Sequence, residues 1–250
     1  TRTGAVNQRL ALRFSKLGFR TFAWPAFTIR LPEDETPVVK RFSDLSDIDL
    51  VLLVSPASVA AVAHWVDHWP SHVTLATVGE GTARVARAAW GESVPIIYPA
   101  GDAAHSGSEA LMAELRKRGI PSRVLICRGQ TGREWLSEEL LSEGADVQKL
   151  MCYERLPLQL TVQQEDELRE AMKGPAPVTY ITSSEAIVSL LRAVHPVEGA
   201  WEWITSGAVV VIHPRSESKV LEAGFHLVRM SSPIDDEVEK NVIACAEGLG

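Results

Sequence analysis

One structural unit recurs along the chain: a short aliphatic run, then small polar residues, then an amphipathic helical pattern. Its copies are LVLLVSPASVAAVAHWV (50–66), TLATVGEGTARVARAAWG (74–91), VLICRGQTGREWLSEELL (124–141), VTYITSSEAIVSLLRAV (178–194) and VVVIHPRSESKVLEAGF (209–225). Continuous apolar strands that alternate with helices are typical of parallel sheets covered on both faces, because a strand buried on both sides has no alternating polar positions. The repeat therefore predicts an α/β protein with doubly wound parallel sheets.

Two extended, proline-containing segments interrupt this repeat: PAFTIRLP (25–32) and KLMCYERLPLQL (149–160). A chain that leaves one domain at the first segment and returns at the second forms an inserted domain between them. The predicted parts are a discontinuous first domain (1–26 and 159–250), an inserted second domain (32–152) and two connector strands (26–31 and 152–158). The first residues, TRTG, resemble the end of a strand that runs at once into a helix, so we expect the chain to begin inside a strand.

Composition limits the class of protein. A chain of 250 residues with 46% hydrophobic content can bury a large core. Its longest apolar runs, such as AVVVI at 208–212, are far shorter than the roughly 20 residues of a membrane helix. We also expect no secretory leader before Thr1. We therefore expect a globular cytoplasmic protein without a membrane partner.

Charge and cysteine content exclude further classes. The chain has 25 Lys and Arg against 32 Asp and Glu, a net charge of −7, and no basic cluster that would neutralise a phosphate backbone. We therefore expect no nucleic-acid partner. Cys127, Cys152 and Cys245 are odd in number and lack CxxC spacing, so neither a disulfide framework nor a zinc ribbon is indicated. These cysteines are expected to be buried thiols.

Helix-start signals follow several of the predicted strands. Pairs typical of capping boxes are Ser106/Glu109, Thr131/Glu134, Thr161/Gln164 and Thr182/Glu185, and Ser55 precedes a proline suited to the first helical position. Such residues usually do no more than start helices. In parallel sheets, however, these turns lie at the carboxyl ends of the strands, where helix N-termini direct N–H groups at anionic ligands. Two domains that face each other are therefore expected to line one cleft with anion-binding amides.

Nucleotide and nucleophile motifs are incomplete. RGQTGR (128–133) lacks the GK[ST] ending of a phosphate-binding loop. VGEGTAR has Arg84 where a dinucleotide-binding turn needs a small residue. There is no GxSxG sequence and no cysteine at a predicted helix start. We therefore expect no NAD or ATP, and no hydrolase chemistry.

The histidines do not form a recognisable metal motif. His64, His68 and His72 share a helical spacing, but Pro70 interrupts the helix and no HExxH glutamate accompanies them. We predict no metal site there. His213 follows a predicted strand, where it could face the cleft or serve a structural role.

The remaining polar groups near the predicted turns suit a polyanion. They comprise hydroxyl groups, arginines and one tyrosine: Ser55, Ser58, Thr82, Thr131, Ser183, Ser184, Ser216, Arg2, Arg128, Arg133, Arg215 and Tyr153. Fixed dipoles and a few local cations can create a favourable potential for an anion even in an acidic protein.

An ordered series of motifs runs along the chain: TR, LP, DLVLLVSPASV, VGEGTAR, SGSEAL, VLICRGQTGREWLSEELLSEGADV, MCYER, YITSSEAI and HPRSESKVLEAGF. This series resembles the uroporphyrinogen-III synthase family over nearly the whole chain. The resemblance implies two flavodoxin-like α/β domains joined by a two-stranded extended connector. It also implies a cofactor-free lyase of porphyrin, tetrapyrrole and heme biosynthesis. Such an enzyme cyclises hydroxymethylbilane in the interdomain cleft, with inversion of the last pyrrole ring and loss of water.

The resemblance also implies roles for residues. Tyr153 matches the tyrosine of the family's hinge, where its phenol could act as a general acid toward the departing hydroxyl group or simply pack. Thr82 and Ser184 match binding hydroxyls, whereas Arg215 and Ser216 stand where relatives often have paired threonines. The predicted substrate-binding set is Arg2, Ser55, Ala57, Ser58, Gly81, Thr82, Arg128, Gly129, Gln130, Ser183, Ser184, Arg215 and Ser216.

The RGQTGR turn is expected to have two functions. Its amides, with Arg128 and Gln130, are predicted to bind a carboxylate arm of the substrate, while Thr131 and Glu134 start the helix. Two other functions share the predicted organisation: a two-lobed binding protein for a small anionic ligand without catalysis, and a two-domain glycosyltransferase. The pattern requires no more than a monomer, and the preceding hydroxymethylbilane synthase is a candidate partner.

Overall fold

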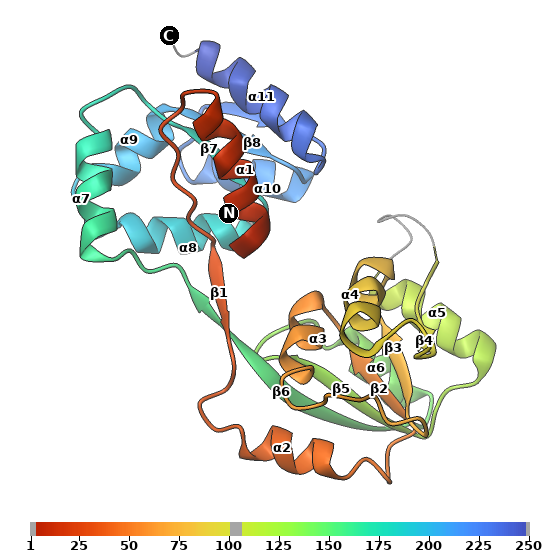
Figure 1. The fold of residues 1–250 in the computed structure, drawn as a ribbon. Helices are drawn as coiled ribbons and strands as arrows, with labels where there is room; N and C mark the ends of the chain where they lie inside the picture. The colour runs from red at the N-terminus through yellow and green to blue at the C-terminus, as the bar shows by residue number, and fades with distance from the viewer. Residues whose placement is uncertain (1–3, 101–106, 249–250) are drawn as a thin grey trace. The chain divides into compact units, whose positions relative to one another are not determined.

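The computed structural model describes residues 4–100 and 107–248 (Figure 1). The chain forms two compact units. We call residues 29–155 the inserted unit, and residues 1–28 with 156–250 the terminal unit. Arg2 and Ser106 lie outside the described residues, as does the strand end expected at Thr1.

The inserted unit contains a parallel sheet. Its strands are β2 (Leu50–Leu53), β3 (Thr74–Thr77), β4 (Ile96–Ile97), β5 (Arg123–Gly129) and β6 (Asp146–Pro157), and β1 (Phe27–Arg30) lies beside β6. The order is β1-β6-β5-β2-β3-β4, and the pairs from β6 to β4 are all parallel. The helices are α2 (Thr36–Ser43), α3 (Pro56–Val62), α4 (Glu80–Trp90), α5 (Ser108–Arg118) and α6 (Trp135–Ser142).

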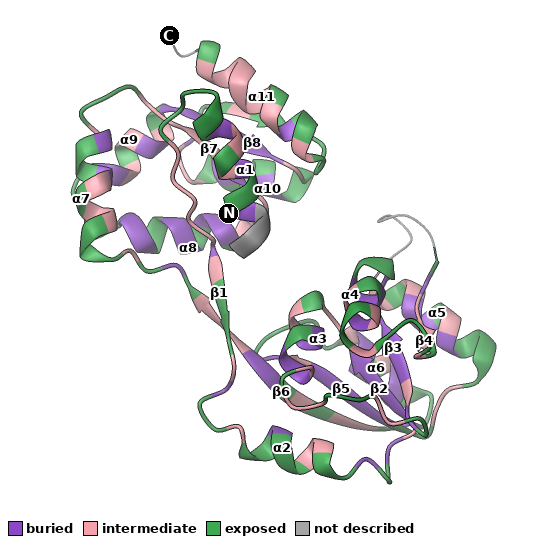
Figure 2. Ribbon diagram, viewed as in Figure 1, coloured by how far each residue is buried: buried purple, intermediate pink, exposed green. Residues whose placement is uncertain are grey.

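Alternate residues of the inserted sheet enter two separate cores. Val51 and Leu53 pack in one cluster with Val59 of α3, whereas Leu50 and Leu52 pack in another with residues of α5 and α6. All four residues of β2 are fully buried, which explains why its sequence has no polar alternation (Figure 2). The sheet is therefore covered by helices on both faces.

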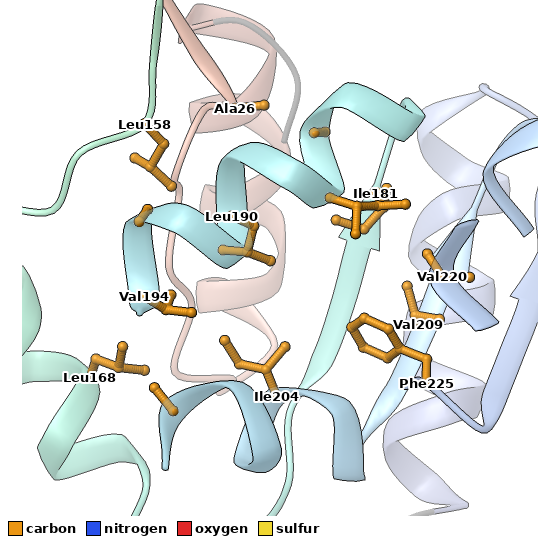
Figure 3. Packing of buried hydrophobic residues seen from close by; sticks show 14 of the residues in the cluster. Ala26, Leu158, Leu168, Ile181, Leu190, Val194, Ile204, Val209, Val220 and Phe225 are labelled. Atoms are coloured by element: carbon orange, nitrogen blue, oxygen red, sulfur yellow. The ribbon is translucent and has the colours of Figure 1, made fainter. Parts of the chain in front are cut away.

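The terminal unit repeats this architecture with a three-stranded sheet. The strands β7 (Val178–Ile181), β8 (Ala208–Val211) and β9 (Leu227–Met230) pair in parallel in the order β7-β8-β9. The helices are α1 (Gly4–Lys16), α7 (Val162–Ala171), α8 (Ser184–Val194), α9 (Ala200–Ser206), α10 (Pro214–Glu222) and α11 (Asp235–Glu247). Figure 3 shows one core, in which Leu190 of α8, Ile204 of α9 and Phe225 meet Val209 of β8. A second cluster joins Leu10 and Phe14 of α1 to Val238 of α11.

The chain passes between the two units along β1 and β6, and a buried serine fixes both crossings to the terminal unit. Ser189 of α8, 3% exposed, donates a hydrogen bond to the Ala26 carbonyl (2.6 Å) and accepts one from the Leu158 N–H (3.0 Å). The same Leu158 N–H also donates to Ala26 (3.0 Å). A polar side chain inside a core must have such partners, since an unsatisfied buried hydroxyl is costly.

The predicted fold class is confirmed, and the five repeats correspond to β2–α3, β3–α4, β5–α6, β7–α8 and β8–α10. The predicted caps at Ser55 and Thr161 are confirmed, since each side chain accepts from a backbone N–H in the first turn. Two predicted helix starts are wrong. Helix α6 begins only at Trp135, after Glu134, which makes no side-chain cap, and α8 is capped by Ser183 instead of the residue before it.

Candidate active site

The order of the strands reverses in the inserted unit. The chain runs from β2 outward to β3 and β4, then returns to β5 on the other side of β2 and continues to β6. In open α/β sheets, ligands bind at the carboxyl ends of the strands at such a switch point, because the connections diverge there and leave a crevice. The turns that follow Leu53 of β2 and Gly129 of β5 lie at this point.

The turn after β2 is held by a reciprocal pair of serines. The Ser55 Oγ accepts a hydrogen bond from the Ser58 N–H (3.0 Å), and the Ser58 Oγ accepts one from the Ser55 N–H (3.1 Å). The Ser58 hydroxyl donates to the Ser55 carbonyl (2.7 Å) and is fully buried. Pro56 and the half-buried Ala57 complete the turn. This capping box uses serine where the usual pattern has glutamate or glutamine.

Tyr153 of β6 lies against this turn. Its phenol oxygen is 3.2 Å from the Ser55 Oγ, within hydrogen-bond distance. The side chain is 7% exposed and belongs to the core cluster that contains Val59, Cys127 and Cys152. The hydroxyl group is therefore the polar end of an otherwise apolar, packed ring, and it lies at the carboxyl end of the sheet.

The side chains of the RGQTGR turn form hydrogen bonds with other residues of the inserted unit. The Arg128 Nη1 donates to the Glu134 Oε1 (2.7 Å), and the Lys149 Nζ donates to the Glu134 Oε2 (2.9 Å). Gln130 bridges to Arg155 in both directions: its Oε1 accepts from the Arg155 N–H (2.8 Å) and its Nε2 donates to the Arg155 carbonyl (3.2 Å). The side chains of Arg128 and Gln130 thus order the turn, in which residues 130–133 are exposed.

The two cations beside Glu134 change its acidity. Hydrogen bonds from Lys149 first, and then from Arg128, lower the pKa of Glu134 to about 2 from an ordinary value of 4.5. The carboxylate therefore stays ionised well below neutral pH and keeps both cations in place.

We expect protonation of the Glu134 carboxylate to make the inserted unit less stable in acid. A lowered folded-state pKa contributes stability above the unfolded value of 4.5 that is lost as the pH falls toward 2. Glu134→Gln should therefore lower the free energy of unfolding at neutral pH, and its difference from the parent protein should shrink as the pH falls from about 5 to about 2. Urea unfolding across this range measures the effect, with Glu138→Gln on the same helix as the control. A difference that does not change with pH would contradict this assignment.

The turn before α4 offers backbone groups. Gly79 is the N-cap residue and provides no side-chain cap, and Gly81 is exposed in the first turn. The first N–H groups of such a helix have no partner within the helix and favour anions. Thr82, by contrast, is only 5% exposed.

In the terminal unit, a hydrogen bond connects the first turns of α8 and α10. The Ser183 Oγ accepts from the Ala186 N–H (3.2 Å), and the Ser184 hydroxyl donates to the Arg215 carbonyl (3.3 Å). The Arg215 N–H donates to the His213 Nδ1 (3.1 Å), so this histidine caps α10, which is a structural role. Ser216 is buried, 2% exposed. The structure thus brings together Ser183, Ser184, Arg215 and Ser216 at adjacent turns.

Other parts of the described chain lie apart from these turns. A pocket of about 620 Å³ in the terminal unit, lined by Phe14, Trp24, Tyr180 and Trp203 among others, contains none of the predicted site residues.

Within residues 4–100 and 107–248, no three His, Cys, Asp or Glu side chains gather where they could hold a metal ion. Burial raises the pKa of the Cys127 thiol well above its usual value, so this group is a poor nucleophile. None of the described helices has both the length and the apolar character needed to cross a bilayer.

Comparison with known proteins decides the family. The sequence model of the uroporphyrinogen-III synthase family (Uroporphyrinogen-III synthase HemD) matches residues 8–237. The chain belongs to this family. It is 25% identical to the uroporphyrinogen-III synthase of Salmonella typhimurium and 24% identical to that of Escherichia coli, with 95% of each chain covered in both comparisons.

Solved structures of the family share the fold. The uroporphyrinogen-III synthetase from Helicobacter pylori matches with a TM-score of 0.62 at 13% identity, over 90% of this chain and 92% of that one. A mutant uroporphyrinogen III synthase from Thermus thermophilus matches with a TM-score of 0.58 at 14% identity, over 98% and 97% of the two chains. Membership of the uroporphyrinogen-III synthase family does not favour the alternative of a binding protein without catalysis.

Sequence reasoning missed the contacts that hold the site residues in place. Nothing in the sequence signals that Ser55 contacts Tyr153, because 98 positions separate them. The bond between Gln130 and Arg155 and the pairing of Glu134 with Lys149 likewise join the turn after β5 to β6. The one available signal is the order of the repeats, which places β5 beside β2 and β6 in a doubly wound sheet.

Proposed function

We propose that this chain is a uroporphyrinogen-III synthase that cyclises hydroxymethylbilane, with inversion of the last pyrrole ring and loss of water. The observation that carries the proposal is the family match, which extends over residues 8–237 and so includes every turn described above. The enzyme would act as a cytoplasmic monomer in porphyrin biosynthesis, one step after hydroxymethylbilane synthase.

The reaction sets modest chemical demands. The hydroxymethyl C–O bond breaks as the pyrrole nitrogen releases electron density, and a C–C bond forms to the substituted carbon of the last ring. The C–C bond that joined this carbon to the rest of the chain then breaks and re-forms at the ring's free position, which inverts the ring. The oxidation level does not change overall, so the step requires no redox cofactor. What the protein must supply is a proton for the departing hydroxyl group and a coiled substrate conformation in which the substituted ring carbon is attacked.

The substrate's acetate and propionate arms would be bound mainly by the main chain. The start of α4 at Glu80 and Gly81 has no side-chain cap, which leaves N–H groups for a carboxylate. The exposed residues of the RGQTGR turn after Gly129 would offer further N–H groups, and Arg128 and Gln130 hold that turn in shape. In the terminal unit, the first turns of α8 and α10 carry Ser184 and Arg215.

Tyr153 is the proposed general acid. Its hydroxyl group lies at the carboxyl end of the sheet beside Ser55, whereas the ring is packed and cannot easily change its position. The phenol would donate its proton to the departing hydroxyl group, which leaves as water. The proton released when the last ring regains its aromatic form would then restore the phenol. Thr82 and Ser216 are buried, so their proposed role is to stabilise the turns and not to contact the substrate.

Coupled turnover tests the proposed function. Hydroxymethylbilane, generated in place from its pyrrole precursor, should be converted to uroporphyrinogen III without added metal or nucleotide. Chromatographic separation of the type I and type III isomers is the measurement, because uncatalysed closure yields only type I. Formation of type I alone, at the rate seen without protein, would defeat the proposal.

A binding surface made largely of main-chain groups predicts that the loss of one hydroxyl has a small effect. Ser184→Ala removes the bond to the Arg215 carbonyl and should raise KM by less than about tenfold, with kcat nearly unchanged. Steady-state kinetics measure this, with Ser206→Ala in the same unit as a control, whose hydroxyl donates to the Trp203 carbonyl. Complete inactivation of a folded Ser184→Ala protein would show that this side chain has a larger role.

A further inference from the structure

We propose that Ser55 is a positioning residue for catalysis: it orients the phenol of Tyr153 so that the phenol proton points toward the substrate. This inference rests on the proposed role of Tyr153 as general acid. It assigns Ser55 an action through the tyrosine, in place of the direct substrate contact suggested by its position in the turn.

The hydrogen bonds of the turn determine where the Ser55 proton can go. The Ser55 oxygen already accepts from the Ser58 N–H (3.0 Å). The Ser58 hydroxyl donates its own proton to the Ser55 carbonyl (2.7 Å), and its oxygen accepts from the Ser55 N–H (3.1 Å). The Ser55 proton therefore has two oxygen atoms within reach, the Ser58 Oγ at 3.5 Å and the Tyr153 phenol oxygen at 3.2 Å. Either hydroxyl can donate across the 3.2 Å contact between Ser55 and Tyr153. We take Ser55 as the donor, because the phenol proton is then left for the substrate.

A phenol that accepts this bond keeps its own proton for another acceptor. Donation from Ser55 also stabilises the negative charge that develops on the phenol oxygen while the proton leaves. The serine thus contributes in two ways. It sets the direction of the Tyr153 O–H bond, and it makes the proton transfer easier without touching the substrate.

Gly129 leaves the space in which the Tyr153 ring lies. The pairing of β5 with β6 shifts register between Arg128 and Gly129, so that Gly129 pairs with Tyr153. A Cβ atom at position 129 would lie 2.8 Å from the ring Cε2 and 3.0 Å from Cζ, closer than real Cβ contacts. The ring lies in the space that a side chain would fill, and Ser55 bonds the hydroxyl group at its tip. Together the two residues leave the phenol little freedom.

A double-mutant cycle tests this role. Ser55→Gly removes the hydroxyl with only a small loss of helix capping, because glycine is tolerated at N-cap positions. We expect Ser55→Gly to lower kcat by about tenfold with little change in KM, and Ser55→Thr, which keeps a hydroxyl, to recover most of that loss. In a Tyr153→Phe background, Ser55→Gly should have less than about a twofold further effect, since the group through which it acts is gone.

The control for helix capping is Thr161→Gly. Thr161 caps α7 by the same reciprocal pattern, with Gln164, but lies outside the proposed site. The Thr161→Gly variant should lose about as much stability as Ser55→Gly but should keep full activity. Thermal unfolding of each variant separates loss of folding from loss of function.

The possible outcomes distinguish this inference from the proposed function. If Tyr153→Phe is fully active, the general-acid role fails, and the role of Ser55 with it. If Tyr153→Phe is slow but Ser55→Gly slows it further by the same factor as in the parent protein, only the positioning role is overturned. A folded Ser55→Gly enzyme with unchanged kcat would also overturn it.

Discussion

Tyr153→Phe is expected to lower kcat for hydroxymethylbilane by on the order of 100-fold, the usual size of a general-acid contribution. Phenylalanine keeps the ring that packs against Val59 and Cys127, and removes only the hydroxyl group that lies 3.2 Å from the Ser55 Oγ. The loss of that one hydrogen bond should change the free energy of unfolding by about 1 kcal/mol. Activity should therefore fall much more than stability.

The measurement is initial-rate kinetics with separation of the two product isomers, together with urea unfolding. Tyr98→Phe in the same unit is a suitable control, because the Tyr98 hydroxyl accepts a bond from Arg87 (3.3 Å) and is not among the proposed site residues. Each variant loses one phenol hydroxyl group, but only Tyr153→Phe should show a lower kcat. An unchanged kcat in Tyr153→Phe would remove the phenol from the mechanism.

Gly207→Ala is expected to destabilise the terminal unit by about 3 kcal/mol, at the upper end of the usual cost of overpacking. A Cβ atom at position 207 would lie 1.9 Å from the Pro177 carbonyl oxygen and 2.9 Å from its carbon. These are backbone atoms, and they cannot move aside easily because the next residues, Val178 and Ala208, are paired in the sheet. Relief of the clash requires separation of β7 from β8 where the pair begins.

Urea unfolding and hydrogen exchange of the peptides that contain β7 and β8 measure this effect. Gly248→Ala in the same unit is the matched control, since its added Cβ would meet the nearest atom, the Ala244 carbonyl oxygen, at an ordinary 3.5 Å. We expect faster exchange in Val178–Ile181 and Ala208–Val211 only for Gly207→Ala. Equal stability of the two variants would mean that the backbone at Pro177 adjusts freely.

The local sequence pattern predicted helices and strands well where burial alone determines them. The apolar runs at β2 and β8 were sufficient, because a strand covered on both faces must be apolar throughout, and both are fully buried. Ser55 and Thr161 could be predicted as caps because a cap bonds to a backbone N–H within three residues. The predicted start at Thr131 failed for a tertiary reason. Glu134, its expected partner, instead binds Arg128 and Lys149, and the helix begins after it.

The sequence by itself determined the α/β class, the positions of the βα repeats and, through the series of motifs, the family, because burial periodicity and capping are properties of neighbouring residues. Tertiary structure alone decided how the candidate catalytic group is held. Tyr153 lies over Gly129 and beside Ser55 because β6, β5 and β2 are adjacent in the sheet. Those residues are far apart along the chain, and only strand order and a shift in register bring them into contact.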